Sequence, residues 1–250
     1  MRYCHKDIWK SERNVVCGMA SHTGKIDMIR GSIIKSAALF ALPICVGNIL
    51  QQLYGTVDTL VVGNFCDSAA LAAVGSTGSI SFLVIGFCMG ICNGFAIPVA
   101  QRIGAGEPSK MRRYVANAAY LGAGIAVVLT AATGLLCRTI LTAMQTPEEI
   151  FADAYSYIFV IFMGIPASIL YNLLAAIMRS LGDSKTPVYF LALASILNIG
   201  LDFAFILLFR AGVTGAAIAT VLSQLASCLF VLRFLFGPIP PLRITFGGYS

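Results

Sequence analysis

Two aspartates stand in stretches of sequence that are otherwise apolar or small. Asp202 lies with Asn198 in SILNIGLDFAFILLF, residues 195–209, and Asp58 lies in QQLYGTVDTLVVGNF, residues 51–65. An ionised group inside an apolar span costs several kcal/mol, about 2.5–3.5 at the centre of a membrane helix, and by default marks a function. Carboxylate and amide oxygens are hard ligands for a small monovalent cation, and a carboxylate also accepts a proton.

The composition of the chain is that of an integral membrane protein. Of its 250 residues 58% are hydrophobic and only 11% are charged, whereas a soluble domain carries roughly a quarter charged residues. A hydrocarbon core of ~30 Å needs about 20 apolar residues per helix, and the mean hydropathy is +0.85. The pattern predicts an all-α protein with six spans, at residues 36–63, 79–100, 114–136, 154–178, 188–209 and 214–236.

The placement of Lys and Arg predicts the orientation of these spans. Of the 17 basic residues, only Arg138 and Arg210 fall in the segments on one side, which leaves 15 on the other. Both termini are therefore expected in the cytoplasm of a cell whose membrane the chain crosses. No basic cluster carries interleaved aromatic residues, so nucleic-acid binding is not expected.

This topology places several polar residues at overlapping depth in the outer half of the bilayer. At 1.5 Å per residue, Asp202 lies ~21 Å from the inner end of its span, and Asn198 is one turn deeper on the same helix face. Thr220 lies about two turns inside the last span, which begins outside. Asp58 lies late in the first span, which runs outward, and Tyr54 precedes it by one turn.

Each of these residues also has a structural interpretation. Asp58 could be hydrated at the outer interface, and Asn198 could bond to a neighbouring helix, as intramembrane amides usually do. Thr220 taken alone is more often a packing residue than a ligand. The set is more informative than its members, because all of them supply oxygen atoms at a similar depth.

Longer motifs support a resemblance to a known family. The stretch FALPICVGNILQQLYGTVDTLVVGNF (residues 40–65), followed by ALAAVGSTGSI (70–80), resembles the first helix and following loop of multidrug and toxic compound extrusion (MATE) transporters. The stretches NGFAIPVAQRIGAGEPSKMRR, MRSLGDSKTPVYF and GVTGAAIATVLSQ extend the resemblance in order through the sixth helix. It covers residues 28–244.

The resemblance implies a twelve-helix fold of two six-helix lobes that exports drugs and organic cations against a Na⁺ or H⁺ gradient, with no other cofactor. It assigns the cation or proton site of the N-terminal lobe to Asp58, Asn198, Asp202 and Thr220, and a bend of the first helix to Pro43. It also assigns Tyr54, Gln51 and Asn172 to a pocket, although Asn172 could instead cap a helix contact.

The chain departs from the family pattern in length. We divide it into a cytoplasmic segment (1–35), a six-helix lobe (36–236) and the start of an inter-lobe linker (237–250), which reads GPIPPLRITFGGYS. A C-terminal lobe is expected as a missing partner, so the chain would be one half of a transporter.

Two other functions are alternatives to transport: intramembrane proteolysis, and binding or assembly without transport. Paired intramembrane aspartates also occur in membrane aspartyl proteases, where they share a proton and activate water. Those enzymes carry a GxGD motif. Here the residue before Asp202 is Leu201, where the motif has its second glycine. A lobe that binds or assembles without transporting is the other alternative, and a downstream reading frame for six similar helices would argue against it.

The orientation gives a first testable prediction. A cysteine introduced next to Arg112 should be labelled by an impermeant thiol reagent only when the cytoplasmic face is exposed, because the basic residues stay inside. Labelling of that cysteine from outside intact cells would contradict the orientation, and labelling from both sides in equal amounts would indicate dual topology.

Overall fold

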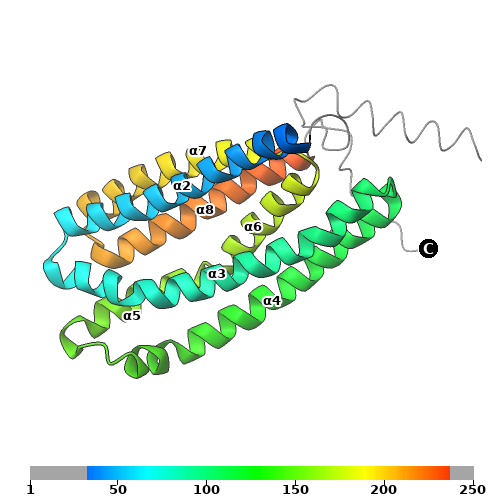
Figure 1. Ribbon diagram of the computed structural model, residues 1–250. Coiled ribbons are helices and arrows are strands. Elements are labelled where there is room, and N and C mark those ends of the chain that lie inside the picture. The colour runs from blue at the N-terminus through cyan, green and yellow to red at the C-terminus, as the bar shows by residue number, and fades with distance from the viewer. Residues whose placement is uncertain (1–32, 237–250) are drawn as a thin grey trace, which may run out of the picture.

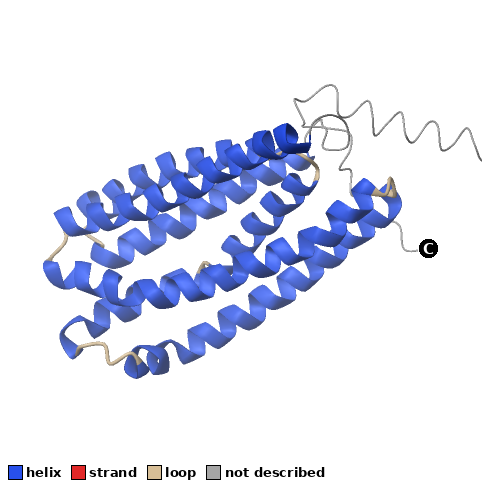
Figure 2. Cartoon of the chain, viewed as in Figure 1, coloured by secondary structure: helices blue, strands red, loops and turns tan. Residues whose placement is uncertain are grey.

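The computed structural model describes residues 33–236 as a bundle of helices, and within this range there is no strand (Figures 1 and 2). The elements are α2 (Ile33–Phe65), α3 (Ser68–Gly104), α4 (Pro108–Ala143), α5 (Glu148–Met163), α6 (Ile165–Ser180), α7 (Lys185–Phe203), the π-helical turn η1 (Ala204–Leu208) and α8 (Gly212–Phe236). The terminal segments 1–35 and 237–250 lie outside the described residues, apart from residues 33–35, which belong to α2.

Five helices in the described part of the chain are long and apolar enough to cross a membrane, and α5 with α6 makes a sixth span if the bent pair is counted as one. This confirms the all-α membrane fold. The helices form two groups (Figure 1): α2, α7 and α8 pack together, and α3 packs against α4. Helices α5 and α6 contact both groups and join them.

The second helix begins earlier than the sequence predicts. Residues 70–80, rich in glycine, serine and alanine, were expected to form a loop, but α3 starts at Ser68. The hydroxyls of Ser76 and Thr77 both donate to the carbonyl of Ala73, at 2.9 and 3.2 Å, which satisfies them within the helix. Because the small side chains Ala70, Ala73 and Val74 are buried, close packing overrides the weak helix propensity of this stretch.

The fourth span, expected as one helix over residues 154–178, is broken. Helix α5 ends at Met163 and α6 begins at Ile165, with an angle of 43° between them. Pro166 has no N–H to continue the helical hydrogen bonds. Gly164 lies against α8, and a Cβ atom there would be only 2.5 Å from Cγ2 of Val221.

The contact between Gly164 and Val221 predicts a specific stability effect. Gly164→Ala should lower the free energy of unfolding by about 1–3 kcal/mol, as overpacking does, and adding Val221→Ala should recover most of the loss. Gly86→Ala is the matched control, because its Cβ would meet nothing within 4 Å. Denaturant unfolding in detergent measures the free energy of unfolding of the unmodified protein, the two single variants and the double variant. Equal stability of Gly164→Ala and Gly86→Ala would contradict the close approach.

Candidate cation site

Three helices that pack on one another carry the candidate residues. Asp58 is on α2, Asn198 and Asp202 are on α7, and Thr220 is on α8. Asn198 and Asp202 are fully buried and Asp58 is 6% exposed. The structure therefore places both carboxylates inside the bundle. In this arrangement Asp58 is buried and is not hydrated at the outer interface.

The two carboxyl groups lie close enough to interact directly with each other. Tyr54 lies within interaction range of both and of Thr220. Neither carboxylate has a basic partner: within residues 33–236 the ion pairs are those that Glu107 makes with Arg102 and Lys110. Two buried carboxyl groups side by side can both be charged only with a cation between them; otherwise at least one of them must be protonated.

The polar atoms of the site lack partners. Among the described residues nine buried side-chain nitrogen or oxygen atoms make no hydrogen bond, and five of them belong to Asp58 (Oδ1), Asn198 (Oδ1 and Nδ2) and Asp202 (Oδ1 and Oδ2). Buried polar atoms are nearly always satisfied in proteins, so each exception needs an explanation such as an ion or water. Carboxylate and amide oxygens match the ligand chemistry of Na⁺.

Local features of α7 and α8 set the geometry around Asp202. The α-helix gives way to the π-helical turn η1 directly after Phe203, and such turns occur frequently at functional sites. Gly215 of α8 lets the two elements approach, because a Cβ there would lie 3.0 Å from Cβ of Phe205. The Thr220 hydroxyl donates to the Ala216 carbonyl at 3.0 Å, which leaves its lone pairs available.

Tyr157 of α5 is a member of the site that sequence reasoning missed. It is buried, and its hydroxyl lies beside the carboxyl group of Asp58. The sequence feature that could have indicated Tyr157 is a tyrosine within an apolar span. Tyr155 carries the same signal but stacks on Phe159 with ring centroids 5.7 Å apart, and the sequence does not distinguish the two.

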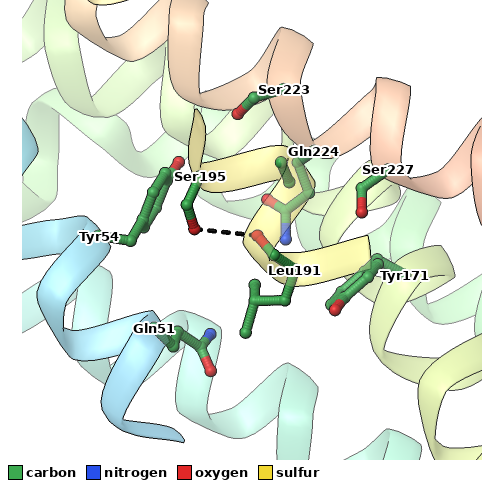
Figure 3. A pocket seen from close by; sticks show the side chains of 9 residues that line it. Gln51, Tyr54, Tyr171, Leu191, Ser195, Ser223, Gln224 and Ser227 are labelled. Carbon is green, nitrogen blue, oxygen red and sulfur yellow. Dashed lines mark hydrogen bonds between the residues drawn. The ribbon is translucent and has the colours of Figure 1, made fainter. Parts of the chain in front are cut away.

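A polar pocket of about 40 Å³ adjoins the site (Figure 3). Gln51 and Tyr54 line it, whereas Asn172 is buried in α6 and donates to the Ser168 carbonyl at 2.8 Å. The assignment of these three residues to a pocket of the transporter stays a prediction. The full lining is Gln51, Tyr54, Tyr171, Leu191, Ala194, Ser195, Ser223, Gln224 and Ser227. Pro43 lies inside the continuous helix α2, where its missing N–H weakens the helix; the bend there stays a prediction.

An all-helical membrane bundle with buried carboxyl groups at the junction of packed helices is the arrangement expected of one repeat of a secondary transporter. The chain belongs to the MatE family, whose model matches residues 43–204. The resemblance noted in the sequence is therefore confirmed. This family consists of transporters, so the protease alternative is wrong.

Relatives and solved structures agree with this membership. The chain is 34% identical over 209 residues to the probable multidrug resistance protein YpnP of Bacillus subtilis, covering 84% of this chain and 47% of the relative. It is 31% identical over 216 residues to the probable multidrug resistance protein NorM of Thermotoga maritima, covering 85% and 46%. The chain thus spans about half the length of the curated relatives it matches.

A crystal structure of MATE in the straight conformation matches with a TM-score of 0.80 and 28% identity, covering 90% of this chain and 50% of that one. A structure of MATE in the bent conformation matches with a TM-score of 0.75 and 29% identity, covering 81% and 45%. The described helices therefore have the fold of one lobe of these proteins.

The position of Tyr157 predicts a selective effect on the site. Tyr157→Phe should raise the Na⁺ concentration needed for half-maximal thermal stabilisation by about 2–10-fold, the equivalent of one hydrogen bond. The ring still fills its space, so the unfolding temperature without added cation should change little. Tyr155→Phe, on the same helix, is the control. Equal effects of the two substitutions would remove Tyr157 from the site.

Proposed function

We propose that the chain is the N-terminal half of a cation-coupled antiporter that exports drugs or organic cations across the cell membrane. The carboxyl groups of Asp58 and Asp202, with the Asn198 amide and the Thr220 hydroxyl, would bind the coupling Na⁺ or accept the coupling proton. The drug substrate is supported by the multidrug resistance names of the relatives.

The observation that carries this proposal is the buried carboxyl pair, which has unpartnered oxygens and no basic partner in the described part of the chain. A structural carboxylate would be paired or hydrogen-bonded, because leaving it bare costs several kcal/mol. Binding of a cation or a proton removes this cost, and its release restores the cost. That difference is what a coupling site needs in order to bias a conformational change.

Alternating access requires one repeat to rock against another around the binding site. We place both termini in the cytoplasm, with the carboxyl pair nearer the outer surface. The partner surface would be a second lobe equivalent to the other half of the relatives.

The role of Asp202 gives a direct prediction. In a chain completed with a compatible second lobe, Asp202→Asn should abolish gradient-driven efflux without reducing the amount of folded protein. The amide keeps the shape but neither takes up a proton nor offers a full charge to Na⁺. Asp58→Asn should act in the same direction, and Thr220→Ala should cost less because water can replace one neutral ligand.

Efflux from vesicles under an imposed Na⁺ or pH gradient measures this, alongside protein level. Asp153→Asn is the matched control, because it makes the same chemical change at an exposed carboxylate, and its efflux should equal that of the unmodified protein. Normal gradient-driven efflux in Asp202→Asn would mean that this carboxylate is structural and would overturn the assignment.

The need for a second lobe gives a separate prediction. Residues 1–250 expressed alone should insert into the membrane and give little drug efflux, because no opposing surface closes a central cleft. Co-expression with a compatible second lobe should restore efflux. Drug resistance conferred by the 250-residue chain in a host without such a lobe would contradict the half-transporter proposal; insertion without any rescue would favour a lobe that binds or assembles but does not transport.

A further inference from the structure

The lining of the polar pocket lies to one side of the candidate site along α7 and α8. Along α7 its lining runs from Ser195, three residues before Asn198, back to Leu191. Along α8 it runs from Ser223, three residues after Thr220, to Ser227. Because the two helices are antiparallel, both runs lead toward the end of the bundle where α2 begins and α8 ends (Figure 1).

Contacts across the helices confirm this direction. The Ser227 hydroxyl donates to the Phe190 carbonyl at 3.2 Å, and the Tyr171 hydroxyl donates to the Pro187 carbonyl at 3.2 Å. Both carbonyls lie near the start of α7. The pocket therefore reaches from the depth of the candidate site about two helical turns toward the side of the membrane on which the described chain begins and ends.

The lining of the pocket suits water. The side-chain amide of Gln51 has no hydrogen-bond partner within residues 33–236, and that of Gln224 accepts one hydrogen bond, from Ser168 Oγ at 2.9 Å. Ser195 and Ser223 donate to carbonyls of their own helices and keep lone pairs that can accept. A volume of about 40 Å³ holds two or three waters and is far below the several hundred Å³ of a drug site.

Tyr54 stands between the pocket and the carboxyl pair. It lines the pocket, and its ring lies beside Ser195 in Figure 3. On its other side it is within interaction range of Asp58, Asp202 and Thr220. An ion moving from the pocket to the carboxyl groups would therefore pass close to this ring.

We propose that the pocket is a water-filled chamber that connects the carboxyl pair with the side of the membrane on which α2 begins and α8 ends, and that the ring of Tyr54 is the barrier between chamber and site. The proposal rests on the proposed function, since it gives the coupling cation a release path through this lobe. An antiporter must release inward the ion that it binds from outside, and the pocket supplies polar surface in that direction.

Cysteine labelling tests the chamber in the membrane-inserted chain. Ser195→Cys and Ser223→Cys should react with an impermeant thiol reagent added on the side where α2 begins and α8 ends, because a hydrated thiol can ionise. Ile196→Cys is the matched control: its side chain is 70% exposed on the outer surface of the bundle, where lipid prevents ionisation. We expect labelling of the two serine positions at least about tenfold faster than the control.

Site-resolved mass spectrometry reads the labelling, and the buried native Cys88 and Cys92 serve as unlabelled internal references. Labelling of Ser195→Cys and Ser223→Cys only from the opposite side, or no faster than Ile196→Cys from either side, would overturn the chamber. These substitutions are nearly isosteric, so folding should be retained.

A second set of variants tests the barrier. Thr220→Cys should be protected from the same reagent while Tyr54 is present and should be labelled at least about tenfold faster with Tyr54→Ala. Tyr54→Phe keeps the ring and should keep the protection. Equal labelling of Thr220→Cys with Tyr and Ala at position 54 would show that the ring is no barrier.

The labelling results do not depend on ion coupling, so the two failures can be told apart. A dry pocket together with loss of efflux in Asp202→Asn would leave the coupling site standing and refute the chamber. A hydrated pocket together with normal efflux in Asp202→Asn would refute the coupling site and leave a chamber without that role.

Discussion

Two carboxyl groups lie side by side in the apolar interior of this bundle, and no basic side chain of residues 33–236 pairs with them. In low dielectric a bare carboxylate is unstable, and a second one beside it makes the first still less stable. The pair can therefore exist only in a protonated state or with a cation. The chain must therefore fold and insert into the membrane with a proton or a cation at this pair.

The surrounding helices hold the pair without neutralising it. Val61, Val62 and Ile206 belong to one apolar core together with Tyr157, so bulk water is excluded from that side. The break at Gly164 and the π-helical turn after Phe203 are departures from regular helix on two elements that contact α8. Irregular backbone inside a membrane is tolerated where it is buried in protein or lines a cavity, and both departures occur beside the helix that carries Thr220.

The sequence predicted six spans, which the described residues give when the bent pair α5 and α6 is counted as one, and it proposed four polar residues that the structure brings close together. Hydropathy and intramembrane charge are strong and local signals. Asp58, Asn198, Asp202 and Thr220 could be grouped by depth alone, since helical rise converts residue number into distance. The start of α3 at Ser68 could not be predicted, because small and hydroxyl residues become helical only when neighbouring helices pack on them. The close approach of Gly164 to α8 involves Val221, 57 positions away in the sequence, and the place of Tyr157 beside Asp58 depends on which face of α5 meets α2. Contacts between distant segments are not encoded in local pattern.

The central claim is that Asp58 and Asp202 exchange a proton or a Na⁺ ion at this site. Isotope-edited infrared spectroscopy of the membrane-inserted chain, with the carboxyl groups of aspartate labelled, tests it directly without requiring transport. The account predicts a carboxyl signal, absent from Asp202→Asn, that switches between the protonated and ionised forms on titration with acid or with Na⁺ in place of choline. A signal that is unchanged by pH and by Na⁺ would contradict it.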